Sequence, residues 1–387
     1  MTKLQELDNK YIAHTYGRFP VDIVDGKGSI LIDAEGKKYI DMGSGIGVTI
    51  FGTADEKWMK AVTDQLGKFQ HTSNLYYTNP CVKLAELICC KTGMKKVFFG
   101  NSGAEANECA IKTARKYAAE KKGKEYSTII TLKNSFHGRT LTTLSATGQE
   151  HYHELFQPLT PGFAYAQPGD LEGFKKLAKD TKAAGVLMEC IQGEGGVNVM
   201  DKEFIQGVAK YCKDEDIILM IDEVQTGNGR TGMLYSYMNF EIEPDVVSTA
   251  KGIGGGLPLG VCILGEKVKD VFAPGDHGST FGGNPVCCAG AISIMERLDD
   301  KFLESVREKS RYIFESLKDA PGIEGVYGIG LMIGIKTTKP AGEIVKTCID
   351  KGVLCLTAKD KVRLLPALNI PMELLSQAIE IIKETCK

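Results

Sequence analysis

Residues 217–227 read IILMIDEVQTG: five apolar residues, two acids and a polar stretch that ends in glycine. The apolar run is typical of a strand that is buried on both faces. An apolar run at 185–188 and an amphipathic helix pattern over 201–212 precede it, and together they predict a βαβ unit. Because such strands belong to parallel sheets covered by helices on both sides, this stretch predicts an α/β fold.

The alternation of helix and strand extends on both sides of this unit. Further strands are expected at 96–99, 127–132, 245–249 and 261–264. Short β-prone runs with glycine turns precede this region, and a long helical stretch over 289–317 and a last helix from Pro371 follow it. We therefore expect residues 51–285 to form a large domain, and residues 1–50 and 286–387 to form a smaller α+β domain together.

Composition excludes several classes of function. The chain has 47 basic and 49 acidic residues, a net charge of −2, so its bulk charge predicts no nucleic-acid or membrane-surface partner. No apolar run approaches the length of about 18 residues that a membrane span requires, and the N-terminus lacks a signal-peptide core. The twelve cysteines form no C-x-x-C and lie mostly in apolar runs, which indicates free thiols in a reducing cytoplasm. Glycine is over-represented, with 44 residues against a usual share of about 7%, so backbone geometry must explain it.

Three expected strand ends carry polar or glycine-rich sequence, at the edge where open parallel sheets bind ligands. The first is GNSGAEAN at 100–107, where a strand meets a helix. Glycines allow close approach of the backbone, and free amides at a helix start attract an anion such as phosphate. The alternative is a serine cap with turn glycines and no ligand.

The second strand end is the acidic pair Asp222 and Glu223. A carboxylate at this place can hold a cationic ring nitrogen, ligate Mg²⁺, or only cap a helix. The Mg²⁺ alternative, a phosphate-loop nucleotide-binding protein, requires the string G-x-x-x-x-G-K-[ST], which the sequence lacks.

The third strand end places Lys251 after an apolar strand and before the glycine-rich run 252–256. A partly desolvated lysine has a lowered pKa, and its free amine can condense with an aldehyde. An ordinary lysine with an extended side chain is the alternative. Together the three strand ends match pyridoxal phosphate, which needs a phosphate cradle, an acid for its pyridinium nitrogen and a lysine for its aldehyde.

These residues belong to a larger set of motifs that resembles the class III aminotransferases. The set covers nearly the whole chain and includes the segments 101–107, 136–140, 192–196, 222–232, 243–245, 250–252 and 278–285. The resemblance implies a fold-type I pyridoxal-phosphate-dependent transferase with a mostly parallel seven-stranded sheet in its large domain and a smaller α+β domain from both chain ends. It also implies a homodimer with active sites at the subunit interface.

Carried over residue by residue, the resemblance assigns the contacts of the cofactor. Lys251 and Asp222 would be the catalytic residues: Lys251 would bind the aldehyde and move the proton, and Asp222 would keep the pyridinium nitrogen protonated. Gln225 would bond the ring hydroxyl. The other implied cofactor contacts are Gly103 and Ala104 at the phosphate, Phe136 and Val224 on the ring faces, Glu223, and Thr280 from the neighbouring subunit.

The resemblance also implies how substrates bind. Arg139 would clamp a substrate carboxylate, which suits its planar guanidinium. Glu194 would neutralise Arg363 while the amino donor is bound and release it for a carboxylate of glutamate or 2-oxoglutarate. Ser279 would contact the acylated end of the donor from the other subunit. No metal is expected, because the histidines at 137, 151 and 153 lack the spacing of a ligand set.

The most similar subgroup implies transfer of the δ-amino group of N2-acetyl-L-ornithine to 2-oxoglutarate, in arginine biosynthesis. Ile46 favours an acylated donor, because ornithine aminotransferases tend to have tyrosine there. The alternatives are ornithine, succinylornithine, 4-aminobutyrate, an aminomutase acting on glutamate semialdehyde, and a non-catalytic scaffold, which an intact Lys251, Asp222 and Arg139 argue against. The stretch FGTADE at 51–56 replaces the Gly-His-x-His-Pro that the family usually has there, and this departure could alter the substrate entrance.

Overall fold

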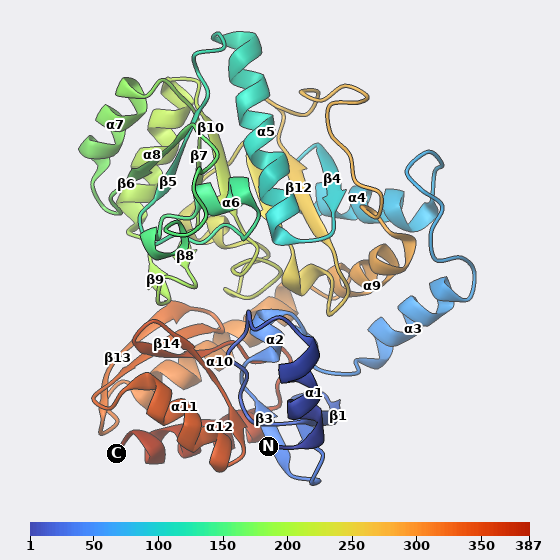
Figure 1. Cartoon of the computed structure of the whole chain (residues 1–387), viewed down its shortest axis with the longest axis vertical. Coiled ribbons are helices and arrows are strands. Elements are labelled where there is room, and N and C mark those ends of the chain that lie inside the picture. The colour runs from blue at the N-terminus through green and yellow to red at the C-terminus, as the bar shows by residue number, and fades with distance from the viewer.

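The computed structural model describes all 387 residues, and a seven-stranded sheet lies at its centre (Figure 1). The strands, in spatial order, are β4 (Lys96–Gly100), β12 (Gly260–Leu264), β11 (Val246–Thr249), β10 (Ile218–Asp222), β7 (Ala183–Met188), β5 (Thr128–Leu132) and β6 (Phe163–Ala166). All pairs from β11 to β6 are parallel, and only β12 runs antiparallel to its neighbours. The predicted mostly parallel sheet is confirmed, and the 217–221 run supplies its central strand.

Helices cover both faces of this sheet, and the side chains of β10 show why its sequence is continuously apolar. Ile218 and Met220 pack in one buried cluster with α5 (Gly103–Lys121). Leu219 and Ile221 pack in another, with α7 (Leu171–Asp180) and α8 (Lys202–Asp214). Since successive side chains of a strand point to opposite faces, a strand covered on both sides must be apolar at every position.

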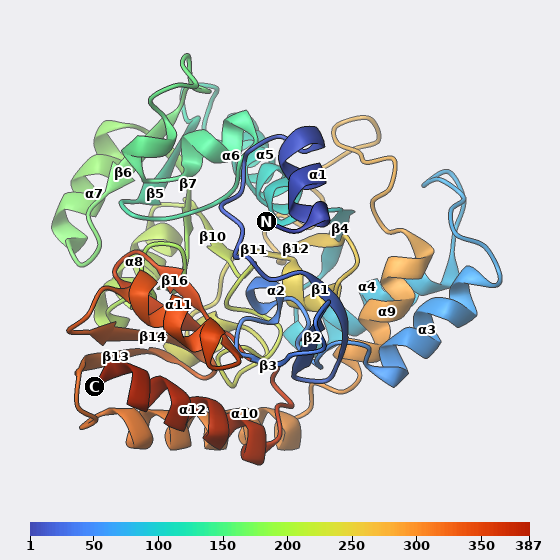
Figure 2. The same cartoon turned by 60° about the horizontal axis from the view of Figure 1, so that its bottom comes forward.

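The two ends of the chain meet in smaller sheets, drawn in the lower part of Figure 1 and brought forward in Figure 2. One sheet contains β1 (Ile23–Lys27), β2 (Ile30–Asp33), β3 (Lys38–Asp41) and β15 (Val353–Leu354). A second contains β13 (Ile323–Ile329), β14 (Met332–Thr337), β17 (Lys361–Leu364) and β16 (Leu356–Ala358), and a ribbon pairs β8 (Ile191–Gln192) with β9 (Asn198–Val199). Because β3 pairs with β15, the smaller α+β part is built from both chain ends, as expected. The exact boundaries at 50 and 285 stay a prediction.

The remaining helices include one correction. They are α1 (Lys3–Tyr11), α2 (Ser44–Gly47), α3 (Glu56–Leu66), α4 (Asn79–Thr92), α6 (Leu141–Ala146), α9 (Pro285–Met295), α10 (Asp300–Leu317), α11 (Ala341–Asp350) and α12 (Met372–Cys386), with 3-10 turns η1 (Glu150–Tyr152), η2 (Ser236–Phe240) and η3 (Lys251–Ile253). The single helix predicted over 289–317 is wrong, because the chain breaks between α9 and α10. There Asp299 accepts a bond from the N–H of Phe302 at 2.8 Å and starts a new helix as its N-cap.

The structure bears on two expectations from the sequence, the lack of a membrane span and the burial of the cysteines. None of the helices combines the length and the apolar character that crossing a bilayer requires. Nine of the twelve cysteines are buried, which agrees with their expected use as small apolar residues.

Candidate active site

A cavity of about 610 Å³ opens at the carboxyl ends of the central strands. The predicted site residues that line it are Gly103, Ala104, Phe136, Arg139, Glu194, Asp222, Val224, Gln225 and Lys251. The three strand ends singled out in the sequence therefore meet in one cavity, as the rule for open parallel sheets requires.

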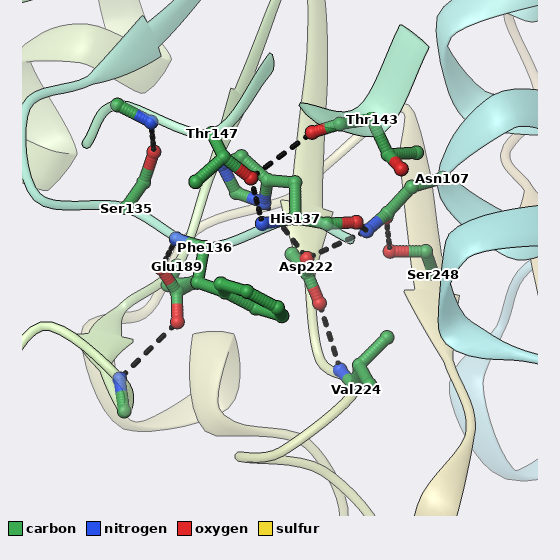
Figure 3. A network of polar contacts seen from close by, with 12 residues as sticks. Asn107, Ser135, Phe136, His137, Thr143, Thr147, Glu189, Asp222, Val224 and Ser248 are labelled. Atoms are coloured by element: carbon green, nitrogen blue, oxygen red, sulfur yellow. Dashed lines mark hydrogen bonds and ion pairs between the residues drawn. The ribbon is translucent and has the colours of Figure 1, made fainter. Parts of the chain in front are cut away.

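Asp222 ends β10 and is held from three sides, as Figure 3 shows. Its Oδ2 accepts bonds from Nδ2 of Asn107 and Nδ1 of His137, both at 2.8 Å, and its Oδ1 accepts the N–H of Val224 at 2.9 Å. Ser248 in turn donates to Oδ1 of Asn107 at 2.5 Å. Because an ionised carboxylate only accepts hydrogen bonds, these donors fix its orientation and stabilise its charge.

Lys251 begins the turn η3 directly after β11 and faces the same cavity. Burial lowers the pKa of its ammonium, and the carboxylates of Glu194 and Asp222 only partly oppose this shift. The residue has a φ of +47°, in the left-handed region that non-glycine residues rarely adopt. Such a backbone is typical of functional sites, where the surrounding structure holds a costly conformation.

The N-terminus of α5 forms a cradle for an anion. Ser102 caps the helix by accepting the N–H of Glu105 at 3.1 Å, and the first helical backbone bond runs from Ala106 to Ser102. The amides of Gly103 and Ala104 precede that bond, so the helix itself leaves them free. A Cβ at position 103 would lie 2.7 Å from Cγ1 of Val224, so only glycine fits against this wall of the cavity.

Glu194 and Arg363 form an ion pair at one side of the cavity. Arg363, on β17, donates through Nη1 to Oε1 of Glu194 at 2.6 Å and to Oε1 of Gln225 at 3.2 Å, and Gln225 donates to Glu194 at 3.2 Å. Burial acts to raise the pKa of Glu194, but the Arg363 guanidinium and these bonds bring it below its usual value. Nε of Arg363 is buried without a partner, so the guanidinium keeps an unused donor.

Arg139 lies at the exposed rim of the cavity and makes no ion pair within the chain. Its guanidinium lies 4.2 Å from the ring centroid of Tyr152 and 5.3 Å from that of Phe136. These cation–π contacts hold the side chain in place while leaving its N–H groups free for a carboxylate.

Four predicted residues do not line this cavity. Arg363 lies behind the lining and bonds Glu194 and Gln225, and Ser279 and Thr280 were expected at the cavity of the other subunit. The Glu223 side chain turns away from this cavity: Oε1 accepts from Ser236 at 2.6 Å and from the N–H of Tyr237 at 2.8 Å, and Oε2 accepts from Thr226 at 2.6 Å. The expected cofactor contact of Glu223 is therefore not seen, because it follows Asp222 and points to the opposite face. Ser279 contacts Asn101 at 2.9 Å beside the cavity, and Thr280 is exposed outside it.

Asn107, His137 and Glu189 line the cavity, and sequence reasoning assigned none of them a part in it. Asn107 lies on the buried face of α5, and a buried side-chain amide needs a polar partner, which in this case is Asp222. Glu189 follows the apolar strand β7 just as Asp222 ends β10, so the same strand-end pattern could have identified it. The histidines weighed as metal ligands have other contacts: His137 bonds Asp222, and His153 bonds the carbonyl oxygen of Leu144 at 2.9 Å.

Comparison with known proteins gives the class to which this fold and cavity belong. The family profile described as aminotransferase class-III matches residues 11–386. The chain is 46% identical over 384 residues to the acetylornithine aminotransferase of Haemophilus ducreyi, covering 99% of this chain and 98% of that protein. It is 42% identical to the acetylornithine aminotransferase of Methanocaldococcus jannaschii, covering 98% and 96%.

Solved structures of similar proteins have the same fold. The ornithine aminotransferase of Toxoplasma gondii superposes with a TM-score of 0.95 at 29% identity, covering 99% of this chain and 94% of the other. The acetylornithine aminotransferase of Elizabethkingia anophelis gives a TM-score of 0.87 at 30% identity, covering 99% and 97%. The chain belongs to the class III aminotransferases. It is accordingly a pyridoxal-phosphate-dependent transaminase with a fold-type I architecture.

The residues present fit pyridoxal phosphate. The free amides at the start of α5 suit its phosphate, and Asp222, oriented by three donors, suits its pyridinium nitrogen. Lys251, with its lowered pKa, suits its aldehyde. The absence of a side chain at Gly103, where a Cβ would collide with Val224, keeps the cradle open.

Proposed function

We propose that this transaminase moves the δ-amino group of N2-acetyl-L-ornithine to 2-oxoglutarate, giving N-acetyl-L-glutamate 5-semialdehyde and L-glutamate, as a step of arginine biosynthesis in the cytoplasm. The names of the relatives from Haemophilus ducreyi and Methanocaldococcus jannaschii support this donor. One observation carries the proposal: the cavity has one free guanidinium, Arg139, and one that is neutralised, Arg363. Such a cavity accepts a donor with a single carboxylate and a terminal amine.

Different residues of the cavity would hold different parts of the cofactor. When bound, the cofactor supplies an electrophilic aldehyde and an electron-withdrawing ring. Gly103 and Ala104 would donate their amide N–H groups to the phosphate, and Asp222 would bind the ring nitrogen. Gln225 would bond the ring hydroxyl. Phe136 and Val224 would pack against the ring.

Lys251 handles the proton of the transfer. Its Nζ accepts and returns a proton while the substrate is held beside it, which requires an amine that is not permanently charged. Burial lowers the pKa of this ammonium and so favours the uncharged amine.

Glu194 lets one cavity accept two different substrates. While acetylornithine is bound, it remains on Arg363 and cancels the positive charge near the neutral part of the donor. When 2-oxoglutarate or glutamate is bound, Glu194 moves aside and Arg363 receives the second carboxylate in a bidentate contact. The unpartnered Nε of Arg363 supports this exchange, because a guanidinium with a spare donor can accept a new carboxylate.

Ornithine is the main rival donor, since ornithine aminotransferases are among the similar structures. Ile46 favours the acetylated substrate, because an aliphatic side chain offers no group that binds a free α-amine. A panel of ω-amines tests the choice: kcat/KM for acetylornithine should exceed that for ornithine, succinylornithine and 4-aminobutyrate. Equal values for acetylated and free ornithine would contradict the proposal.

We further propose a homodimer that completes each cavity. The exposed side chains of Leu75, Tyr76, Tyr77 and Phe281 form an apolar patch on two neighbouring loops, which Asn74 links by donating to the carbonyl oxygen of Ser279 at 3.0 Å. Exposed apolar patches of this kind mark association sites. Thr280 and Ser279 lie on this patch and would reach the phosphate and the acyl end in the other subunit.

Two measurements test the dimer. Light scattering should give about twice the 42.1 kDa chain mass. A mixed dimer of a Thr280→Ala chain and a Lys251→Ala chain should recover one intact site. Each cavity takes Lys251 from one subunit and Thr280 from the other, so both substitutions fall in one cavity and the other cavity has neither. A monomer, or a mixture no more active than its parents, would contradict the shared site.

A further inference from the structure

Glu189 is a buried carboxylate of the cavity wall that takes no direct part in the proposed transfer. It follows β7 directly and is 6% exposed. The two other acids of the cavity each have a charged or ring partner: Asp222 has His137, and Glu194 has Arg363. Glu189 makes no ion pair, and burial raises its pKa to about 7. Burying an acid is energetically costly, so the hydrogen bonds of Glu189 indicate its role.

The contacts of Glu189 are two backbone N–H groups from different segments. Oε2 accepts the N–H of Phe136 at 3.0 Å, a bond drawn in Figure 3, and Oε1 accepts the N–H of Gly193 at 3.2 Å. A neighbouring bond joins the same two segments, from Nε2 of Gln192 to the carbonyl oxygen of Lys133 at 2.8 Å. One carboxylate therefore ties together two loops that are far apart in the sequence.

Each of these loops carries a residue that the proposed reaction uses. The first presents the Phe136 ring to the cavity, and its next residue, His137, donates to Asp222. The second leads from Gly193 directly into Glu194. A Cβ at Gly193 would lie 2.3 Å from Oε1 of Gln225, so the backbone beneath Glu194 is seated directly against this amide.

We propose that Glu189 is a positioning residue: it fixes the backbone beneath Glu194 against the wall that carries Phe136, so that Glu194 changes partner by rotation of its side chain alone. The inference rests on the proposed exchange between Glu194 and Arg363. Only a carboxylate presents two acceptor oxygens to two N–H groups, whereas the amide of a glutamine turns its own NH₂ group toward one of them. Glu189→Gln therefore breaks one tie with the smallest change of shape.

Hydrogen exchange on the cofactor-free protein tests the tie without any substrate. At a pH above the pKa of Glu189, Glu189→Gln should speed exchange in peptides covering 133–140 and 190–196 by about tenfold, as expected when one hydrogen bond to a charged group is lost. The control is Asp33→Asn, a change from acid to amide away from the cavity: Oδ1 of Asp33 accepts the N–H groups of both Glu35 and Lys37 at 2.9 Å, and exchange in the two cavity loops should not change. Unchanged exchange in both loops of Glu189→Gln would overturn the proposal.

Kinetics then test whether Glu189 acts through Glu194. Glu189→Gln should lower kcat/KM for the amino donor about tenfold relative to kcat/KM for 2-oxoglutarate, because only the donor requires Glu194 to remain on Arg363. When Glu189→Gln is added to the Glu194→Gln variant, the ratio should change by no more than about twofold. Glu189 acts through Glu194, and Glu194 is already altered in that variant. An unchanged ratio in the single variant, or a tenfold loss that persists in the double variant, would overturn the positioning role.

The two tests separate this inference from the proposed function. If the substrate panel identifies another ω-amine, the proposed donor fails, but hydrogen exchange still reports the tie and the ratio can be measured with that amine. If the panel supports acetylornithine while exchange and the ratio do not change, only the role of Glu189 fails.

Discussion

Two acids of the same cavity, Asp222 and Glu194, are held in opposite ways. Asp222 is 4% exposed at the end of a central strand, and both of its oxygens accept bonds from fixed neighbours. The Glu194 side chain is 30% exposed on a glycine-rich loop, and its guanidinium partner retains an unused buried donor. The difference is what the proposed exchange requires, because Asp222 is held in place whereas Glu194 has few contacts to give up.

The local structure explains this contrast. Asp222 is anchored by α5 through Asn107 and by the loop after β5 through His137, so moving it would disrupt several elements. Glu194 is connected mainly to Gln225 and Arg363, and the exchange of one side-chain contact frees it. Rigid scaffold elements with polar residues on adjoining loops are the usual way in which proteins combine precise and adaptable groups.

Removing Lys251 should have the largest effect, because both acids act around its amine and both influence its pKa. Lys251→Ala should lower transamination by at least about a hundredfold, the range for loss of a group that transfers protons. The absorbance of the bound cofactor near the border of the visible and ultraviolet should also be lost. Lys267→Ala is the control, because Lys267 pairs with Asp216 at 3.0 Å away from the cavity; a variant at 251 with an unchanged spectrum would refute the assignment.

Breaking the fixed acid should come next in size. Asn at position 222 has one acceptor oxygen and would turn its NH₂ group toward a donor, either the N–H of Val224 or the pair formed by Asn107 and His137. Asp222→Asn should lower kcat/KM by about a hundredfold, the scale of losing a preorganised electrostatic contact, and weaken binding of pyridoxal phosphate. Ser248→Ala removes only the bond that orients Asn107, so a loss of only about fivefold is expected. Equal losses in the two variants would contradict a special role of the carboxylate.

Breaking the movable pair should change selectivity more than rate. Glu194→Gln removes the charge that neutralises Arg363, so the amino donor should lose about tenfold in kcat/KM while 2-oxoglutarate loses less. Arg363→Lys should show the reverse preference, because an ammonium cannot form the bidentate contact with a carboxylate. Separate measurement of the two half-reactions checks this, and parallel losses in both would show that the pair does not alternate.

The sequence predicted the sheet and much of the cavity because both follow from local patterns. An apolar strand that ends in an acid or a lysine marks the functional edge of an open sheet whatever the rest of the fold does. The partners of Asp222 were not predictable in this way, since Asn107 and His137 come from segments 115 and 85 residues away and only tertiary packing brings them together. Glu223 was misplaced although the alternation of side chains along a strand already separates it from Asp222.

Substitutions in a strained turn beside the cavity should have the smallest effect, a change in stability. Residues 44–47, in α2, have φ angles of 48°, 63°, 65° and 75°, a left-handed turn that Asp41 supports by accepting the N–H groups of Gly43 and Ser44 at 2.9 and 2.8 Å. Ile46 is β-branched and 42% exposed, so it bears the full conformational cost and buries little surface in return.

Ile46→Gly should therefore raise the free energy of unfolding by about 1 kcal/mol, since a non-glycine residue in this conformation costs about 1–2 kcal/mol and glycine loses part of that gain through its freer unfolded chain. Gly45→Ala is the mirror-image control: a Cβ there meets nothing closer than 3.7 Å, so the expected loss of stability comes from the backbone alone. Calorimetry should move the two variants in opposite directions. If both lose stability, the turn is not strained at Ile46, and packing contacts of the side chain must explain the isoleucine.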